Sequence, residues 1–383
     1  MDLTVKRQAS PYAPVEYTPT EKDWEHIKLI EDFFNEEGIP YEKDDKIFGL
    51  YYLDNKSVEV RYINSFYYPM DNSKRFGDKC KGVVHDYFYR ISYDKAHDKN
   101  NSVRVIWIFD FEMEQVNPPT PAEEASSDYK PYHRQWEVIK NTLRTCTGHI
   151  HYRFYARDCE IKEVPNTVLR PFLETNCFYG YRAANKNLGL YLKKDKNGLK
   201  AGTLLMVFTF GYNFYGNKKR TDDPFIEIIR VSTLIGCQVI GGMSKCLKHF
   251  CMEYPTLTIG GKDIKVNELR FYCDNSHNDG RGMQSGGLNF EFVSWDSFGF
   301  MNRWVEDYCS PDGKLKGKAG EIFQRKPMFH KLIMQLIGEG KIVSIANAGT
   351  GVYRITRKEY LSRFEDGREL LEKEEEKEMT VHN

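Results

Sequence analysis

Three consecutive stretches decide the fold: IEIIRVST (226–233), VIGGMSKCLKHF (239–250) and ELRFYCD (268–274). The first and third are rich in β-branched or aromatic residues, which predicts strands. The second changes to helical spacing after two glycines. A strand, a glycine turn, a helix and a strand in this order indicate an α+β layer in which the helix packs on a sheet.

The residues before this core continue the sheet. LGLYLKK (188–194) and TLLMVFTFG (203–211) predict two further strands, and NTVLRPFLETN (166–176) has the spacing of a helix. We therefore predict a mixed sheet with packed helices.

The N-terminal half predicts a second group of elements. Thr20 is a plausible N-cap for an amphipathic helix over residues 21–37. The runs IFGLYYL (47–53) and SVEVRYIN (57–64) predict a β-hairpin, and VRVIWIF (103–109) is apolar enough for a central strand buried on both faces.

Length and composition limit the class of protein. A chain of 383 residues exceeds the roughly 250–300 at which one core stops growing, so two core-bearing units are expected. No apolar stretch approaches the roughly 20 residues that span a bilayer, and the N-terminus lacks a signal-peptide pattern. We expect a cytoplasmic protein with no membrane partner.

The nine cysteines include no CxxC pair, which favours reduced thiols over disulfides. Cys246 and Cys251 flank His249 and are the closest pair. One helix cannot complete a tetrahedral metal site without ligands from elsewhere, so a zinc site is not favoured.

Charge is unevenly distributed in a chain whose formal net charge is zero. Residues 365–378 hold eight acids and three bases, a net −5, so the remainder is +5. Residues 314–331 carry six Lys/Arg against one Glu, and form either a solvated face or a strip that contacts phosphates. The predicted nucleic-acid-binding residues of this strip are Lys314, Lys316, Lys318, Arg325 and Lys326. The acidic tail could fold back on the strip and limit nonspecific DNA binding.

A hairpin that carries an acid, followed by a histidine and an apolar strand, is typical of nucleases that place carboxylates around Mg²⁺. Residues 41–163 resemble the very-short-patch-repair-type, PD-(D/E)XK-like nuclease domain of phage homing-endonuclease-like proteins. The matching stretches are IFGLYYLDNKSVEVRYINSFYY (47–68), His85, IWIFDFEM (106–113) and HYRFYARDCEIKEV (151–164).

This resemblance implies a set of site residues. Glu59, His85, Asp110 and Glu112 are the implied catalytic residues, and Glu59 and Asp54 the implied Mg²⁺ ligands. The sequence departs from the family where Gly49 or its neighbours occupy the position of a metal-binding Asp, and where DYFYR replaces a lysine-containing segment. The departures imply weak or lost phosphodiester cleavage.

The later segments resemble the second domain of the same phage proteins, which is similar to GNAT acyltransferases. In that family a turn with the pattern Q/R-x-x-G-x-G/A holds the coenzyme A pyrophosphate at a helix N-terminus. The turn here matches at Gln238 and Gly241 and departs at Met243, and the implied cofactor-binding residues are Gln238, Gly241, Gly242, Met243 and Ser244. Arg230 would face the substrate, and Asp274 would lie at a strand end; the alternative is a structural ion pair between them.

The expected organisation is a flexible arm (1–20), a degenerate nuclease-like domain (21–164), a GNAT-like domain (165–300), a basic extension (301–364) and an acidic tail (365–383). The expected function is DNA binding with weak or lost Mg²⁺-dependent cleavage. The alternatives are a DNA-modifying acyltransferase like the phage protein Mom, which would use a coenzyme A derivative, and a non-catalytic DNA- or protein-binding factor.

Overall fold

The computed structural model describes residues 18–64, 91–92, 95–96, 98, 101–113, 135–213, 217, 223–285, 287–296, 301–319, 321–324, 329–345 and 348–381. The chain divides into two compact units. Unit 1 comprises residues 1–115, 273–279 and 295–351, and unit 2 comprises residues 116–272, 280–294 and 352–383. Helices and sheets of mixed direction occur in both, so the chain is α+β.

This division differs from the predicted domain ranges. The predicted boundary after residue 164 falls inside unit 2, because β5 (Tyr152–Tyr155) pairs with β10 (Cys237–Ile240) and β6 (Cys159–Glu163) pairs with β7 (Lys186–Leu192). Both pairings join residues on either side of that boundary. The predicted extension is also divided, with residues 301–351 in unit 1 and 352–364 in unit 2.

The first described helix of unit 1 is α2 (Glu21–Glu36), which confirms the predicted amphipathic helix. The Thr20 hydroxyl accepts a hydrogen bond from the Asp23 amide at 3.2 Å, and the Asp23 carboxylate accepts one from the Thr20 amide at 2.7 Å. These two bonds satisfy amides that the first helical turn leaves without partners. The buried face of this helix includes Ile30 and Phe34, both completely buried.

The sheet of unit 1 has four strands in chain order: β1 (Tyr41–Lys43), β2 (Leu50–Leu53), β3 (Val58–Ile63) and β4 (Arg104–Phe109). Strands β2 and β3 form the predicted hairpin, and β3 and β4 are parallel. The hairpin turn places Asp54, Asn55 and Lys56 at positive φ, a conformation that Asp and Asn tolerate better than most residues.

Strand β4 is buried as predicted, but it lies at the end of the sheet in the described part of the chain rather than at its centre. Beyond its free edge the Trp107 amide donates to the carbonyl of Ser276 at 2.7 Å. An apolar run indicates that both faces of a strand are buried, but it does not indicate whether the strand has a neighbour on one side or on both.

A small three-stranded sheet completes unit 1, with β15 (Met301–Trp304) between β18 (Ile322–Gln324) and β19 (Ile342–Ile345). The buried Trp304 ring stacks on Phe323 and Tyr308, with ring centroids 5.1 and 5.2 Å apart. A Cβ atom at Gly317 would lie 1.9 Å from Trp304 Nε1, so the indole requires glycine there. The remaining elements here are α9 (His330–Gly338), β16 (Tyr308–Cys309) and β17 (Lys316–Gly317).

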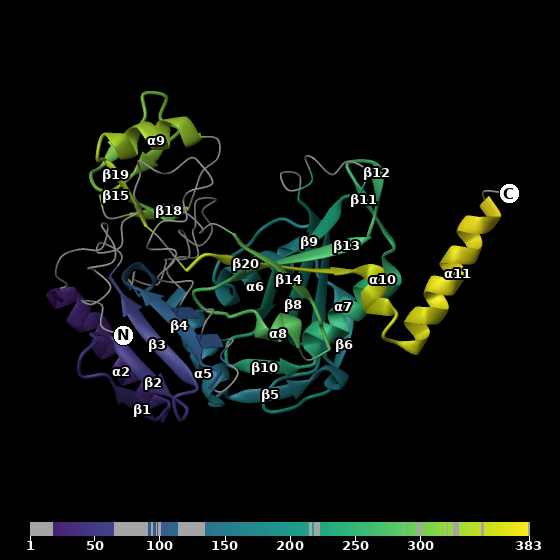
Figure 1. The fold of residues 1–383 in the computed structure, drawn as a ribbon, viewed down its shortest axis with the longest axis horizontal. Coiled ribbons are helices and arrows are strands. Elements are labelled where there is room, and N and C mark those ends of the chain that lie inside the picture. Colours follow the sequence, from purple (N-terminus) through teal and green to yellow (C-terminus); the bar gives the residue numbers. More distant parts are fainter. Residues whose placement is uncertain are drawn as a thin grey trace. The chain divides into compact units, whose positions relative to one another are not determined.

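Unit 2 is built on a seven-stranded sheet of order β14-β20-β13-β9-β8-β7-β6 (Figure 1). Strands β8 and β9 are antiparallel, whereas β9 and β13 are parallel. The predicted strands are confirmed to within a few residues: β8 (Leu204–Tyr212), β9 (Phe225–Thr233) and β13 (Glu268–Asp274). The other two are β14 (Glu291–Asp296) and β20 (Thr350–Thr356).

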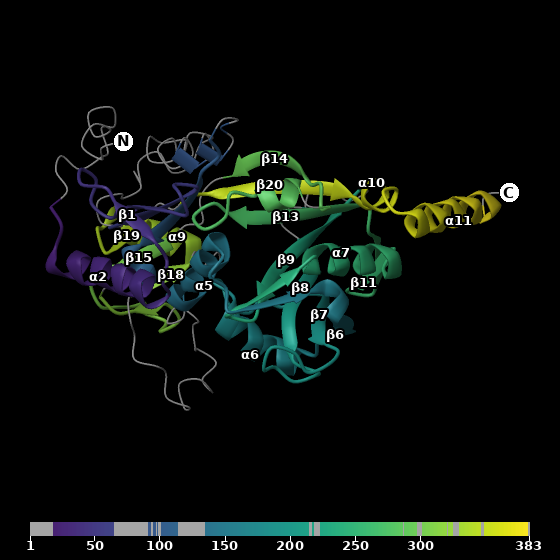
Figure 2. The ribbon, with the colours of Figure 1, turned by 90° about the horizontal axis from the view of Figure 1, so that it is seen from below.

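Helices α6 (Asn166–Asn176) and α7 (Gly242–Glu253) cover opposite faces of this sheet (Figure 2). Phe250 of α7 stacks on Phe210 of β8 with ring centroids 3.6 Å apart. Leu169 and Leu173 of α6 pack with Val207 of the same strand. Val207 and Phe210 are three residues apart, and therefore point to opposite sides of the strand.

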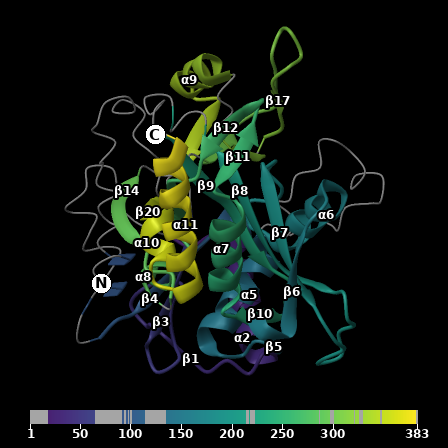
Figure 3. The same cartoon turned by 90° about the vertical axis from the view of Figure 1, so that its right-hand side faces the viewer.

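The chain ends in α10 (Arg357–Leu361) and α11 (Glu365–Val381), both yellow in Figure 3. The acidic tail is thus a helix. Glu374 accepts two hydrogen bonds from Arg357, at 2.7 and 2.8 Å, and Asp366 pairs with Lys248 at 2.7 Å. These basic partners differ from the strip at residues 314–331 that the sequence indicated.

Unit 2 also contains helices α5 (Gln135–Thr147) and α8 (Arg281–Gln284) and strands β11 (Thr256–Ile259) and β12 (Lys262–Lys265). None of the helices in the described ranges has the length and apolar character to span a membrane.

Candidate functional site

Glu59, the predicted catalytic carboxylate of unit 1, is 3% exposed in the middle of β3. Arg61 lies two residues further along the strand, and therefore on the same face. Its Nε and Nη2 atoms donate to Glu59 Oε2 at 3.0 and 2.7 Å. The ammonium group of Lys95 donates to the other carboxylate oxygen. Two cations therefore already hold both oxygens of Glu59.

The cations also set the ionisation of Glu59. Burial alone would raise the pKa of its carboxyl, but the charges of Arg61 and Lys95 and their hydrogen bonds lower the pKa below its usual value. Glu59 is therefore ionised at neutral pH, and its charge is balanced within the protein.

Asp110 and Glu112 do not share a site with Glu59. The register of β3 and β4 places Glu59 opposite Val105, five residues before Asp110. Five residues of a strand extend about 16 Å, whereas the oxygen ligands of Mg²⁺ lie about 2 Å from the ion. The two groups of carboxylates therefore form separate environments.

The other predicted nuclease residues are dispersed. Asp54 lies in the β2–β3 turn, where its carboxylate accepts a hydrogen bond from the Ser57 hydroxyl at 2.7 Å. His85 lies outside the described residues. In the ranges that the structure describes, no three His, Cys, Asp or Glu side chains are grouped to hold a metal ion. This finding includes Cys246 and Cys251, both buried thiols whose pKa burial raises to about 12.

Glu112 belongs to a buried cluster that the sequence did not indicate. His277 Nε2 lies 3.4 Å from Glu112 Oε2, and His277 Nδ1 lies 3.6 Å from Asp274 Oδ2. Burial would lower the pKa of His277, but the charge of Glu112 and hydrogen bonds to both carboxylates raise it to about 10. His277 is therefore a cation at neutral pH. Asp110 lies close by in sequence and pairs with Arg303 at 3.4 Å.

The predicted cofactor turn of unit 2 lies between β10 and α7. Gly241 is the N-cap of α7 and has φ +75°, a left-handed conformation that glycine adopts without strain. A Cβ atom at Gly242 would lie 2.7 Å from Met206 Sδ and 3.1 Å from Leu190 Cδ1. The first glycine is thus required by the backbone turn, and the second by close packing of the helix on the sheet.

The amino end of α7 has the geometry of an anion site. The first hydrogen bond of the helix runs from the Lys245 amide to the Gly241 carbonyl at 3.0 Å. The amides of Gly242 and Met243 precede it, so they have no acceptor within the helix. Such amides, together with the helix dipole, favour phosphate groups. Ser244 and Gln238 are half-buried beside the turn.

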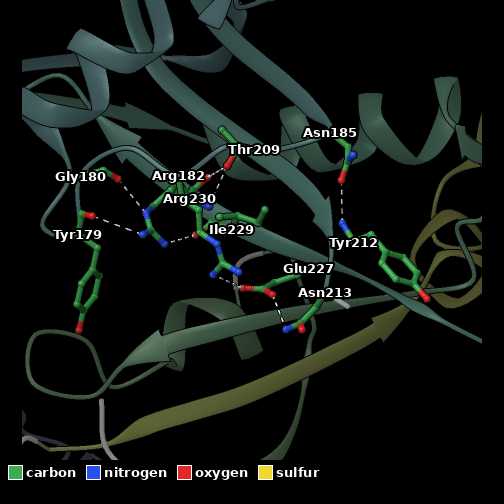
Figure 4. A network of polar contacts seen from close by, with 10 residues as sticks. All are labelled: Tyr179, Gly180, Arg182, Asn185, Thr209, Tyr212, Asn213, Glu227, Ile229 and Arg230. Carbon is green, nitrogen blue, oxygen red and sulfur yellow. Dashed lines mark hydrogen bonds and ion pairs between the residues drawn. The ribbon is translucent and has the colours of Figure 1, made fainter. Parts of the chain in front are cut away.

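A polar network on the α6 face of β9 contains the residues that sequence reasoning missed (Figure 4). Glu227 is 7% exposed, and its carboxylate accepts a hydrogen bond from Asn213 Nδ2 at 2.7 Å. Arg182, which is half-exposed, approaches its other oxygen at 3.6 Å. Burial raises the pKa of Glu227, and the charge of Arg182 and the bond from Asn213 only partly oppose the rise.

Arg230, on the same face, is held by the backbone. Its guanidinium donates to the carbonyl oxygens of Ile229 at 2.8 Å, Gly180 at 3.0 Å and Tyr179 at 3.5 Å (Figure 4). Arg230 therefore fixes the 179–180 segment against β9. This contact explains its position without the predicted ion pair to Asp274.

The sheet is irregular beside this network. Strands β9 and β13 pair over only four residues, from Phe225↔Glu268 to Ile228↔Phe271. The pairing of β9 with β8 shifts at the same place, because Thr209 is opposite Arg230 and Phe210 is opposite Ile228. Bulges of this kind re-aim side chains and recur beside active sites.

The predicted basic strip is exposed where it is described. Lys314, Lys316 and Lys318 are exposed and alternate with the buried Leu315 and Gly317. Lys314 lies 3.6 Å from Asp312, so part of its charge is balanced. Two further residues of the strip, Arg325 and Lys326, lie outside the described residues.

Comparison with known proteins gives no family for this arrangement. No family model matches the chain, and no curated protein matches it. The site must therefore be interpreted from its own geometry.

Proposed function

We propose that the protein is a DNA-modifying acyltransferase whose donor, a coenzyme A thioester, binds at the amino end of α7. The observation that carries this proposal is the turn from β10 through Gly241 into α7. At this turn the amides of Gly242 and Met243 have no acceptor within the helix. A pyrophosphate matches such a site in charge and in its need for hydrogen-bond donors. DNA as the acceptor is inferred from the resemblance to phage proteins of this architecture.

Glu227, on the α6 face of the sheet, is the residue that we assign to proton transfer. The acyl arm of a donor bound at α7, on the other face, would reach it between β9 and β13, whose pairing ends at Ile228. The nitrogen of an amine acceptor attacks the thioester carbon, so that a C–N bond forms, the C–S bond breaks and coenzyme A leaves as a thiolate. The amine nitrogen loses one proton in this step, and the departing thiolate takes one up. Glu227 Oε can accept the proton that the amine loses, because its raised pKa makes it a stronger base than an ordinary carboxylate. Asn213 holds one carboxylate oxygen in place, and the half-exposed Arg182 lies beside the other.

Transfer is favoured over Mg²⁺-dependent cleavage at Glu59 by the charges around each glutamate. Arg61 and Lys95 occupy both oxygens of Glu59, so a metal ion would have to displace two cations. The negative charge of Glu227 is less compensated, because its neighbours are a neutral amide and a guanidinium 3.6 Å away. Loss of cleavage with retention of DNA binding is the expected property of unit 1.

A matched pair of variants tests the donor site. Met243→Pro removes one amide hydrogen in the first helical turn, where proline is tolerated, and Met243→Ala keeps that hydrogen. We expect isothermal titration to show coenzyme A binding about tenfold weaker in Met243→Pro and unchanged in Met243→Ala. Circular dichroism checks that both variants fold.

Equal affinity in the two variants, or no binding by the wild type, would reject this donor site. Transfer itself is measured by incubating the full chain with acetyl coenzyme A and DNA, followed by mass spectrometry of the released nucleosides. An added acetyl mass on one nucleoside is the expected result.

A further inference from the structure

Residues 151–158 and 193–200 form one exposed surface of unit 2, which we call the Tyr155 surface. The two segments are joined by three contacts. Asn197 Nδ2 donates to the Arg153 carbonyl at 3.2 Å, Lys193 Nζ donates to the Arg157 carbonyl at 3.1 Å, and Lys196 pairs with Asp158 at 2.6 Å. The loop between β7 and β8 therefore lies along β5 and continues its surface.

This surface is strongly basic in a chain of zero net charge. Its two segments contain six Lys/Arg and two Asp, a net +4. Both aspartates have lysine partners within the surface, Asp158 with Lys196 and Asp195 with Lys200. The remaining four cations, Arg153, Arg157, Lys193 and Lys194, are exposed and have no carboxylate partner in the part of the chain that the structure describes.

Aromatic rings lie among these cations. Tyr155 is 43% exposed and Tyr152 is 41% exposed, which is unusual for rings that could pack in a core. The Arg157 guanidinium lies 4.9 Å from the centre of the Tyr155 ring, and Lys196 Nζ lies 5.8 Å from it. The ring is thus held beside two cations while much of it faces solvent.

The position of the surface in the fold relates it to the donor turn. Strands β5 and β10 are parallel, with Tyr155 opposite Ile240. Their carboxyl ends therefore lie at the same edge (Figure 1). Gly241 follows Ile240, and a Cβ atom on Gly241 would lie 3.6 Å from Ala156 Cβ. The Tyr155 surface borders the amino end of α7.

We propose that the Tyr155 surface binds single-stranded DNA, with bases stacked on the exposed tyrosines and phosphates held by the surrounding cations. This inference deepens the proposed function, on which it rests for the identity of the acceptor. Exposed rings flanked by cations bind single strands because every base has a face that can stack, and phosphates lie on either side of it. A duplex does not offer these faces, since its bases are already stacked.

The test compares variants of the full chain by fluorescence anisotropy with a fluorescein-labelled 20-nucleotide oligo(dT) and a blunt duplex. We expect the wild type to favour the single strand. Tyr155→Ala should weaken its binding about fivefold to 100-fold, the usual range for loss of one stacked base. Tyr155→Phe is the matched control, because it keeps the ring, and should bind like the wild type.

The cations are tested by salt dependence. Lys193→Ala/Lys194→Ala should reduce the slope of log affinity against log salt by about 1.4, since each phosphate contact to a single strand contributes about 0.7. The matched control is Lys262→Ala/Lys265→Ala, which removes two exposed lysines of β12 outside this surface and should leave the single-strand affinity and its salt slope unchanged.

Two results would overturn the proposal. One is wild-type affinity for oligo(dT) in both Tyr155→Ala and Lys193→Ala/Lys194→Ala. The other is weaker coenzyme A binding in Tyr155→Ala with DNA affinity unchanged, which would assign the surface to the donor nucleotide. Failure of the proposed function has a different signature: oligo(dT) binding still depends on Tyr155, while coenzyme A binding is absent.

Discussion

Glu59 in unit 1 and Glu227 in unit 2 are both glutamates within apolar strands, and both are less than a tenth exposed. The pKa of Glu59 is lowered, whereas the pKa of Glu227 is raised. Burial acts in the same direction on both. The difference comes from the neighbours, because Glu59 has two cations in hydrogen-bond contact and Glu227 has an amide and a more distant guanidinium. Buried carboxylates in similar strands can therefore be structural or reactive, depending on their partners.

The largest effect is expected from Arg61→Met, which leaves the buried Glu59 with Lys95 as its cation. Removing one partner of a buried ion pair costs about 3–5 kcal/mol, because the remaining charge loses its buried counterion. Lys95 is more exposed than Arg61 and compensates Glu59 only in part. Urea unfolding followed by tryptophan fluorescence measures the loss, since Trp107 lies 5.7 Å from the Arg61 guanidinium. The double variant Glu59→Gln/Arg61→Met should recover part of it. No recovery would show that the loss is one of packing rather than charge.

Glu227→Gln tests the other member of the comparison. An amide of the same shape cannot accept a proton, so we expect acyl transfer at least 100-fold slower, the usual contribution of a general base. Coenzyme A affinity should be unchanged, because the amides of α7 are retained. Glu59→Gln is the matched control and should transfer at the wild-type rate. Equal rates in wild type and Glu227→Gln would remove Glu227 from the mechanism.

The two glutamates should affect acid stability in opposite directions. The folded pKa of Glu59 lies below its unfolded value, so its stabilisation is present above the unfolded pKa and is lost as pH falls through the folded pKa. The folded pKa of Glu227 lies above its unfolded value, so its protonation favours the folded state as pH falls. Urea midpoints between pH 3 and 7 should therefore fall less steeply in Glu59→Gln than in the wild type, and more steeply in Glu227→Gln. Parallel curves for the two variants would contradict this assignment.

The smallest effect is expected from Asn213→Ala, which removes the hydrogen bond to Glu227. Such a bond to a charged group contributes about 1.5–3 kcal/mol when its acceptor is ionised. Its loss should raise the pKa of Glu227 further. The transfer rate increases as Glu227 ionises, so this increase should occur at higher pH than in the wild type. A pH–rate profile measures the shift, and Asn185→Ala is a nearby control whose side chain instead accepts from the Tyr212 amide. An unchanged profile in Asn213→Ala would show that Asn213 does not tune the base.

The sequence predicted those elements that depend on local periodicity. Helix α2 with its Thr20 cap, the β2–β3 hairpin and strand β13 lie within a few residues of their expected ranges. The pairing of β5 with β10 was not predicted, because a local sequence pattern does not identify a partner strand about 80 residues away. The domain ranges differ from the two units for the same reason.

The candidate site divides in a similar way. Glu59 stood out as an acid within a strand, and its partner Arg61 lies two residues along the same strand. Its second partner, Lys95, comes from a distant segment and could not be inferred from the hairpin alone. Glu227 lay inside a quoted strand and was not singled out. Burial raises the pKa of Glu227, whereas Arg182 and Asn213 lower it. These two residues lie in separate loops, and no spacing rule connects them with Glu227. The glycine turn was recognised because its requirements are local.

The pairing of β5 with β10 also has a consequence during synthesis of the chain, because β5 is made before its partner strand. Tyr152 precedes its partner Cys237 by 85 residues. At a translation rate of about 5–20 residues per second, roughly 4–17 s pass before β10 follows β5 from the ribosome. For that interval β5 lacks its sheet partner, so its tyrosines and arginines are presented by a strand that is not yet paired. Because the pairing closes a long loop, we expect it to form late in folding.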